Sequence, residues 1–227
     1  MNGFKKTVLA ATAALVLGFG VNAHALIIGA TDGIGGVQTC ADGDACDTTP
    51  IAGIVSASFV FGPASVSVTA GTGLPIIGST TFPEIDLGVS SLVGAGNWDI
   101  RVTQTGFAGP GVNPVNFTHL VGGTLGAGAT ATFNYYADDN NIAFNAAPAG
   151  LTGSLGLFGP GGAFSGTTNG STNLADPFSL TIQALVSQGG GVVTSFDAMT
   201  TTVPEPGTML LMGSGLLGLG LWRKFKK

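Results

Sequence analysis

The amino-acid sequence predicts an all-β fold with the architecture of a β-sandwich. Three observations support it between residues 26 and 202. Short segments alternate apolar and polar residues, clusters of Gly, Pro, Asn and Asp separate these segments, and no helical period is sustained. Seven or more short strands joined by such turns are typical of a β-sandwich, and 227 residues are enough to enclose one core.

The segment at residues 98–103 shows how the strands are predicted. It reads Trp-Asp-Ile-Arg-Val-Thr, so its apolar residues share one face of an extended chain while Asp99, Arg101 and Thr103 share the other. We expect Trp98 and its apolar neighbours to face the core. The same reasoning predicts strands at Ile54–Phe61, Ala64–Ala70, Trp98–Phe107, Ala129–Ala137, Asn141–Asn145, Pro177–Val186 and Val192–Thr201.

Two connections follow from turn chemistry. Asp and Asn tolerate left-handed backbone and bond to nearby backbone groups, so residues 138–140 (Asp-Asp-Asn) are predicted to join 129–137 to 141–145 as a hairpin. The stretch 151–173 is rich in Gly, Ser and Thr. We expect it to form either a long surface loop or weak strands.

Charged residues are few and unevenly placed. Between residues 26 and 203 there are eleven acidic residues and one basic residue, Arg101, which gives a net charge of −10. Nucleic acids and anionic lipids are bound through clustered Lys and Arg. We therefore expect this region to bind no nucleic acid, and divalent cations or a neutral partner fit it better.

The N-terminal 25 residues have a basic start, an apolar stretch at 8–21 and the sequence Ala23-His-Ala25. This order is typical of a secretory signal peptide, expected to be helical, and predicts cleavage after Ala25. The mature chain would then begin at Leu26. An uncleaved anchor is the alternative, which the small-x-small ending disfavours.

The C-terminal residues 203–227 contain Pro204-Glu205-Pro206, the apolar segment Thr208–Trp222 and a basic end. As a helix the apolar segment would be about 22 Å long, against a hydrocarbon core of roughly 30 Å. It is predicted to be a marginal, transient transmembrane helix, with a plain permanent anchor as the alternative. The positive-inside bias places its basic end in the cytoplasm and the preceding domain outside. That basic stop consists of Arg223, Lys224, Lys226 and Lys227.

These C-terminal features together resemble the PEP-CTERM sorting signal of Gram-negative bacteria, and the stretch 177–198 resembles the closing strands common in that group. The resemblance implies export by the Sec route and anchoring in the inner membrane facing the periplasm. An exosortase, a membrane-embedded protease or transpeptidase, would then remove the tail and pass the protein to the cell surface or extracellular matrix. It also implies a link to exopolysaccharide and biofilm. The predicted plan is a signal peptide at 1–25, an all-β extracytoplasmic domain at 26–202 and a sorting tail at 203–227.

Cys40 and Cys46 are the only cysteines. Exported compartments are oxidising, so an intrachain disulfide is predicted. The alternative is a redox-active pair, which the spacing disfavours because it is not Cys-x-x-Cys. In the same loop Asp42, Asp44 and Asp47 flank a glycine, a pattern that suits Ca²⁺, although no EF-hand glutamate follows. Solvated turn aspartates are the alternative, and the weaker acidic pair at 138–139 is interpreted in the same way.

Catalytic candidates are sparse. Glu84 and Asp86 would share one face of an extended segment, and two carboxylates are the minimum set of a glycosidase. His119 is the only histidine after the predicted signal peptide, the mature region contains no lysine, and no Gly-x-Ser-x-Gly elbow is present for a serine triad. We therefore expect a protein without enzymatic activity or a cofactor.

Aromatic residues raise one further hypothesis. Trp98, Tyr135 and Tyr136 are of the type that stacks on sugar rings, and adjacent tyrosines in a strand face opposite sides, so at least one is expected to be exposed. The preferred hypothesis is a non-enzymatic surface or matrix protein. A carbohydrate-binding module is the second, and a self-assembling adhesin, favoured by low charge and β-prone segments, is the third.

Overall fold

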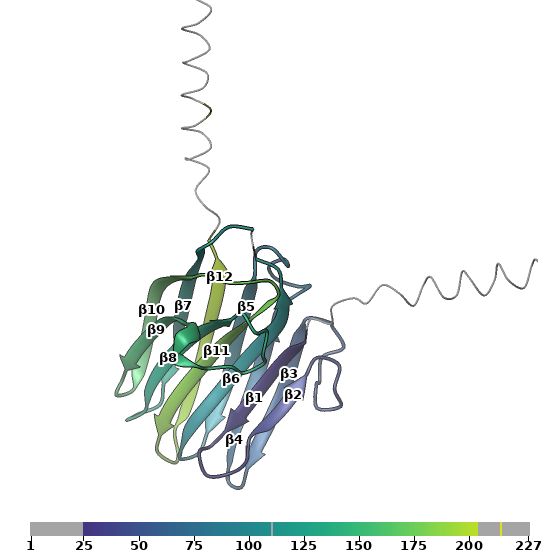
Figure 1. The fold of residues 1–227 in the computed structure, drawn as a ribbon. Coiled ribbons are helices and arrows are strands. Elements are labelled where there is room, and N and C mark those ends of the chain that lie inside the picture. The colour runs from purple at the N-terminus through teal and green to yellow at the C-terminus, as the bar shows by residue number, and fades with distance from the viewer. Residues whose placement is uncertain (1–24, 110, 204–213, 215–227) are drawn as a thin grey trace, which may run out of the picture.

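The computed structural model describes residues 25–109, 111–203 and Ser214, and confirms an all-β architecture of two six-stranded sheets (Figure 1). Sheet A consists of β1 (Leu26–Thr31), β2 (Gln38–Ala41), β6 (Gly96–Phe107), β8 (Thr130–Asp138), β9 (Leu151–Phe158) and β11 (Phe178–Gln188). Sheet B consists of β3 (Ile54–Phe61), β4 (Ala64–Thr72), β5 (Glu84–Val93), β7 (Val115–Leu125), β10 (Gly162–Thr172) and β12 (Val193–Thr202). A 3₁₀ turn, η1 (Pro148–Gly150), precedes β9.

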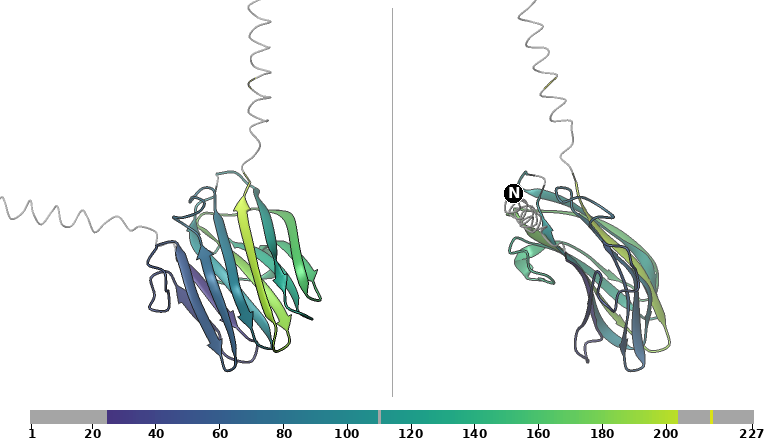
Figure 2. Two further views of the ribbon diagram at one scale, coloured as in Figure 1. Left: turned by 180° about the vertical axis from the view of Figure 1, so that it is seen from behind. Right: turned by 90° about the vertical axis from the view of Figure 1, so that its right-hand side faces the viewer.

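The strand order is β2-β1-β6-β11-β8-β9 in sheet A and β10-β7-β12-β5-β4-β3 in sheet B. All of these neighbours pair antiparallel. The edge-on view in Figure 2 shows the sheets as two curved layers lying face to face. The predicted signal segment and most of the predicted C-terminal helix lie outside the described residues, among which no helix has the length and hydrophobicity to cross a bilayer.

Six of the seven predicted strands match β3, β4, β6, β8, β11 and β12. The strand predicted at Asn141–Asn145 is wrong, and so is its hairpin with β8, which pairs with β9 and β11 instead. The carboxylate of Asp138 accepts hydrogen bonds from the Ile142 backbone N–H and the Asn140 side chain. Asn141 and Phe144 both take left-handed backbone, with φ of 57° and 58°. These features direct the chain away from β8.

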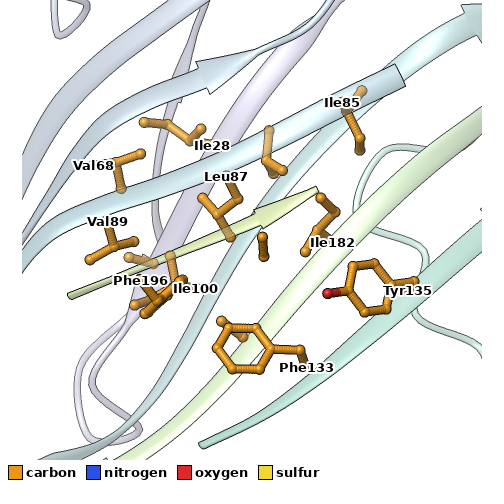
Figure 3. Close-up of a cluster of buried hydrophobic side chains, with 14 of the residues drawn as sticks. Ile28, Val68, Ile85, Leu87, Val89, Ile100, Phe133, Tyr135, Ile182 and Phe196 are labelled. Carbon is orange, nitrogen blue, oxygen red and sulfur yellow. The ribbon is translucent and has the colours of Figure 1, made fainter. Parts of the chain in front are cut away.

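The core lies between the sheets. Trp98, Ile100 and Val102 are at most 1% exposed, which confirms the face predicted from alternation. Figure 3 shows aliphatic side chains of both sheets packed together beside Phe133, Phe196 and Tyr135. Phe133 of β8 meets Phe196 of β12 edge to face at 5.1 Å between ring centroids, so aromatic contacts join the two layers.

The stretch 151–173 was predicted to be either a surface loop or weak strands, and it forms the strands β9 and β10. These are edge strands of different sheets that pack against each other. The approach requires glycine at 170, because a Cβ there would overlap the carbonyl oxygen of Thr152 in β9. One end of the sandwich is thus closed, which reduces the open edge available for association with another chain.

Candidate functional site

The segment from residue 139 to 150 lies across the outer face of sheet A, with η1 in front of the sheet in Figure 1. It is held there by hydrogen bonds to three strands. The Ser179 hydroxyl donates to the carbonyl of Ile142 at 2.9 Å, and the Gly106 N–H donates to the side chain of Asn141 at 2.7 Å. Outward-facing Thr103 of β6 is fully buried, and its hydroxyl donates to the Leu180 carbonyl at 3.0 Å.

A polar network runs across this outer face. The Arg101 guanidinium donates twice to Asp99, from Nε to Oδ1 at 2.8 Å and from Nη2 to Oδ2 at 2.6 Å. Gln183 of β11 donates from Nε2 to the same Oδ2 at 2.9 Å, and its Oε1 accepts hydrogen bonds from Tyr136 and Asn134 of β8. Asp99 of β6 is thus fixed by Gln183 of β11, which is itself held by side chains of β8.

Arg101 is the only basic residue between positions 26 and 203. Its pKa is raised above the ordinary arginine value, chiefly by the hydrogen bond to Asp99, so the guanidinium stays charged. The side chains of Arg101 and Asp99 are 28% and 23% exposed, so this ion pair is partly open to solvent. Its bidentate geometry also holds the guanidinium in one orientation.

A pocket of about 180 Å³ opens beside this ion pair. Phe144 forms one side, and its carbonyl accepts a hydrogen bond from Nη1 of Arg101 at 3.1 Å. A bulky residue in left-handed backbone is strained by on the order of 1–3 kcal/mol and is retained where the surroundings enforce it. The ring lies close to the bare backbone of β1, since a Cβ on Gly29 would be 3.2 Å from Cζ of Phe144. The pocket is lined by Gly29, Ala30, Thr31, Val37, Asp99, Arg101 and Phe144.

His119 lies in the core. It is 0% exposed and stacks on Tyr135 with 4.3 Å between ring centroids. Its Nδ1 pairs with the hydroxyl of Thr200 at 2.7 Å, and no partner for Nε2 is found in the described part of the chain. Burial lowers the pKa of His119 to about 4. A buried, neutral imidazole cannot reach an external substrate as a general base.

Glu84 and Asp86 do lie in an extended segment, β5, on its outward side and half-buried. Asp86 interacts most closely with Asp197 of β12, not with Glu84. Burial raises the pKa of Asp86 to about 8, and the charge of Asp197 and a hydrogen bond with it add to this effect. The carboxylate neighbour of Asp86 therefore comes from another strand, a pairing that spacing within one segment does not reveal.

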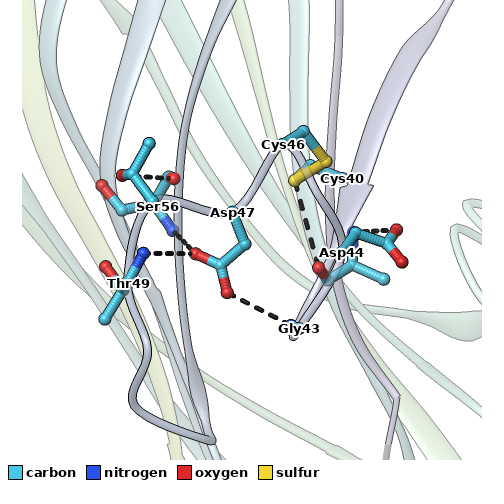
Figure 4. Close-up of a disulfide and its surroundings, with 9 residues drawn as sticks. Cys40, Gly43, Asp44, Cys46, Asp47, Thr49 and Ser56 are labelled. Atoms are coloured by element: carbon cyan, nitrogen blue, oxygen red, sulfur yellow. Dashed lines mark hydrogen bonds between the residues drawn. A yellow bond between two sulfur atoms is a disulfide. The ribbon is translucent and has the colours of Figure 1, made fainter.

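The disulfide between Cys40 and Cys46 is present, as predicted, with Cα atoms 5.9 Å apart (Figure 4). The loop's aspartates do not converge on a common point. Asp47 accepts hydrogen bonds from the backbone of Gly43, Thr49 and Ser56, while Asp44 accepts from Ala41 and Asp42 from Gly53. Within residues 25–109 and 111–203, no group of three or more His, Cys, Asp or Glu is placed to hold a metal ion.

The prediction that Tyr135 or Tyr136 is exposed for stacking on sugars is wrong. Tyr135 is 0% exposed and donates its hydroxyl hydrogen bond to the Leu120 carbonyl of sheet B. Tyr136 points outward but is 8% exposed, because it lies in the polar network beside Gln183. Trp98 is a core residue, packed edge to face on Phe61 at 5.7 Å.

Sequence reasoning missed the pocket and its aromatic wall. A usable signal was present at Arg101, the lone basic residue of an acidic domain, two positions from Asp99 on the same strand face. Phe144 carried no such signal, because its place depends on the path of the 139–150 segment.

Comparison with known proteins identifies the tail. The PEP-CTERM protein-sorting motif matches residues 202–224, which confirms the resemblance drawn from the sequence. No curated protein matches the chain. A solved chain of infectious bursal disease virus strain Gx aligns at a TM-score of 0.33 and 11% identity, covering 82% of this chain and 53% of that one. The present chain thus spans about half the length of that viral chain.

Proposed function

We propose that this protein is a non-enzymatic component of the cell surface or extracellular matrix, associated with exopolysaccharide and processed by an exosortase. The observation that carries the proposal is the PEP-CTERM motif at 202–224, which implies export and surface sorting. The signal peptide at 1–25, the Sec route and a membrane segment at Thr208–Trp222 with a cytoplasmic basic end complete the proposed route.

The place where the chain leaves the domain supports processing of a folded protein. β12 lies between β7 and β5 in sheet B. Its end is fixed by hydrogen bonds from the Thr202 N–H to the Pro83 carbonyl at 3.0 Å and from the Val203 N–H to the Asn116 carbonyl at 2.9 Å. Pro204 follows directly, so the motif begins one residue after these hydrogen bonds. Cleavage beyond this point leaves β12 fully paired.

The burial of His119 supports a non-enzymatic role. His119 is enclosed in the core, and Asp86 is half-buried next to Asp197 on the outer face of sheet B, away from the pocket beside Arg101. Arg101 is engaged by Asp99. General acid–base catalysis needs a group within hydrogen-bond reach of substrate, and His119 is 0% exposed.

The test compares the intact mass of native protein from the cell surface and medium with masses calculated for 26–227 and for tail-less forms. Loss of the tail is expected. Replacing Pro204, Glu205 and Pro206 by alanine should retain the precursor in the inner membrane. A double change, Gly189→Ala with Gly190→Ala, is the control, because an added Cβ there meets no atom within 4 Å. Normal surface delivery of the motif variant would contradict the proposal.

A further inference from the structure

The pocket at Asp99, Arg101 and Phe144 combines an apolar lining with a small number of oriented polar groups. Phe144, Val37 and the backbone of β1 form its walls, and the ion pair supplies its polar part. Ligand sites have this composition, in which apolar surface contributes contact and a few polar groups fix orientation. At about 180 Å³ it is smaller than pockets for drug-sized ligands, which hold roughly 300–1,000 Å³. Its occupant is therefore about the size of one six-membered ring.

The hydrogen-bonding capacity left over defines what the ring must carry. A guanidinium has five N–H donors, and Arg101 gives three of them to Asp99 and to the Phe144 carbonyl. The carboxylate of Asp99 accepts three hydrogen bonds of about four that it can take, the third from Gln183. Two donors and one acceptor therefore remain side by side, and adjacent hydroxyl groups match them because each hydroxyl both donates and accepts.

The charges of the pocket and of the surrounding domain disfavour a ligand ring that is itself charged. The guanidinium and the carboxylate neutralise each other within the pocket, while the region from 26 to 203 carries a net charge of −10. A negatively charged ring would be repelled by the surrounding domain. A positively charged ring would meet the Arg101 guanidinium without a free carboxylate to balance it.

We propose that this pocket binds one neutral pyranose ring, with Phe144 against its apolar face and Arg101 and Asp99 hydrogen-bonded to adjacent hydroxyls. The strained backbone of Phe144 fits this role, because strain of this kind is typical of positions where structure is held for binding. The assignment of exopolysaccharide as the natural source of the ring rests on the proposed function. The binding of a pyranose ring to the pocket is independent of that function.

The experiment is a titration of the full chain in detergent micelles with the methyl glycosides of glucose, galactose and mannose, followed by saturation-transfer NMR. At least one is expected to bind with a Kd on the order of 1 mM, the affinity usual for a ligand of about thirteen heavy atoms. Methyl glucuronide should bind at least tenfold more weakly. Absence of binding at tenfold that concentration, or equal binding of the glucuronide, would overturn the proposal.

Variants locate the site. Phe144→Ala, in a loop, should weaken binding at least tenfold, and Arg101→Lys should do the same because lysine keeps the charge but not the planar fork. Ile142→Ala is the matched control: it lies in the same segment, is 54% exposed and does not line the pocket, so binding should change less than twofold. Unchanged binding in Phe144→Ala, or equal loss in Ile142→Ala, refutes this location.

The sorting-motif variant separates the two proposals. With Pro204, Glu205 and Pro206 replaced by alanine, binding should equal that of the unmodified chain. Failed surface delivery in every form, with binding intact, would count against the proposed function alone. Normal delivery and processing of a chain that binds no neutral glycoside would count against the pocket alone.

Discussion

Replacing His119 by a side chain that cannot be protonated is expected to remove most of the acid sensitivity of the domain. The imidazole is 0% exposed and contacts Tyr135, the titratable group stacked on it, whose own pKa is raised by burial. Burial lowers the pKa of His119 to about 4, against 6.5 in the unfolded chain. Between these two pH values the unfolded chain binds a proton that the folded domain does not.

The free energy of unfolding therefore decreases as pH falls from about 6.5 to about 4. At about 1.4 kcal/mol per pKa unit the loss reaches about 3 kcal/mol. For a domain of this size 1 kcal/mol corresponds to roughly 2–4 °C in Tm, so acidification should lower Tm by about 6–12 °C through this one residue. Above pH 6.5 the same residue contributes no pH dependence.

The perturbation is His119→Phe combined with Thr200→Val, which keeps an aromatic stack on Tyr135 and leaves no buried hydroxyl without a partner. The added volume alters stability at every pH, so the measured quantity is the slope. Asp86 titrates in both proteins on the opposite face of the sheet and cancels in the difference. Urea unfolding from pH 7 to 4, followed by the fluorescence of buried Trp98, supplies the comparison. Parallel stability profiles for the two proteins would refute the reasoning.

Three further perturbations test other parts of the fold. Asp86→Asn should stabilise the domain at pH 9 by about 1–3 kcal/mol and have little effect near pH 4. The reason is that a raised carboxyl pKa favours folding at low pH, and this contribution is lost as pH rises through about 8. Thermal melts at the two pH values measure the difference, and equal effects at both would contradict the prediction. Cys40→Ser with Cys46→Ser should lower the unfolding free energy by about 2 kcal/mol. Faster amide hydrogen exchange should be confined to the loop that the disulfide closes, and faster exchange throughout both sheets would contradict this local effect. Gly170→Ala should lower Tm, because the added Cβ would clash with the β9 backbone at a cost of about 1–3 kcal/mol. Gly122→Ala is the control, because its added Cβ would lie 3.8 Å from the Phe164 carbonyl oxygen and should leave Tm unchanged. Equal melting temperatures for the two variants would refute the close approach.

The strands that alternation predicted are those with one face in the core. β6 is an example, because Trp98 and Ile100 alternate with Asp99 and Arg101. β10 escaped this reasoning although it is equally regular. Its inward positions are Phe164 followed by Gly166, Thr168 and Gly170, and at Gly170 the close approach of β9 leaves no room for a Cβ. A strand whose inward face has a single hydrophobic residue among glycine and threonine shows no hydrophobic period.

Only part of the candidate site could be predicted from the sequence. Asp99 and Arg101 are two residues apart on one strand, so their common face could be predicted from the sequence alone. Phe144 is 43 positions further along and reaches them only because the segment after β8 crosses the sheet. The hairpin predicted at 138–140 placed residues 141–145 in the sheet as a strand. Phe144 was therefore not expected to form the wall of a pocket.

The sorting motif and the pocket lie at different places in the fold and share no strand. β12 is paired on both sides and ends in hydrogen bonds at Thr202 and Val203, upstream of the Pro-Glu-Pro triplet. The pocket lies on the outer face of the other sheet, between β1, β6 and the 139–150 segment. Removing the tail therefore alters no strand that lines the pocket. The two proposals therefore require no conformational change that connects ring binding at the pocket to removal of the tail.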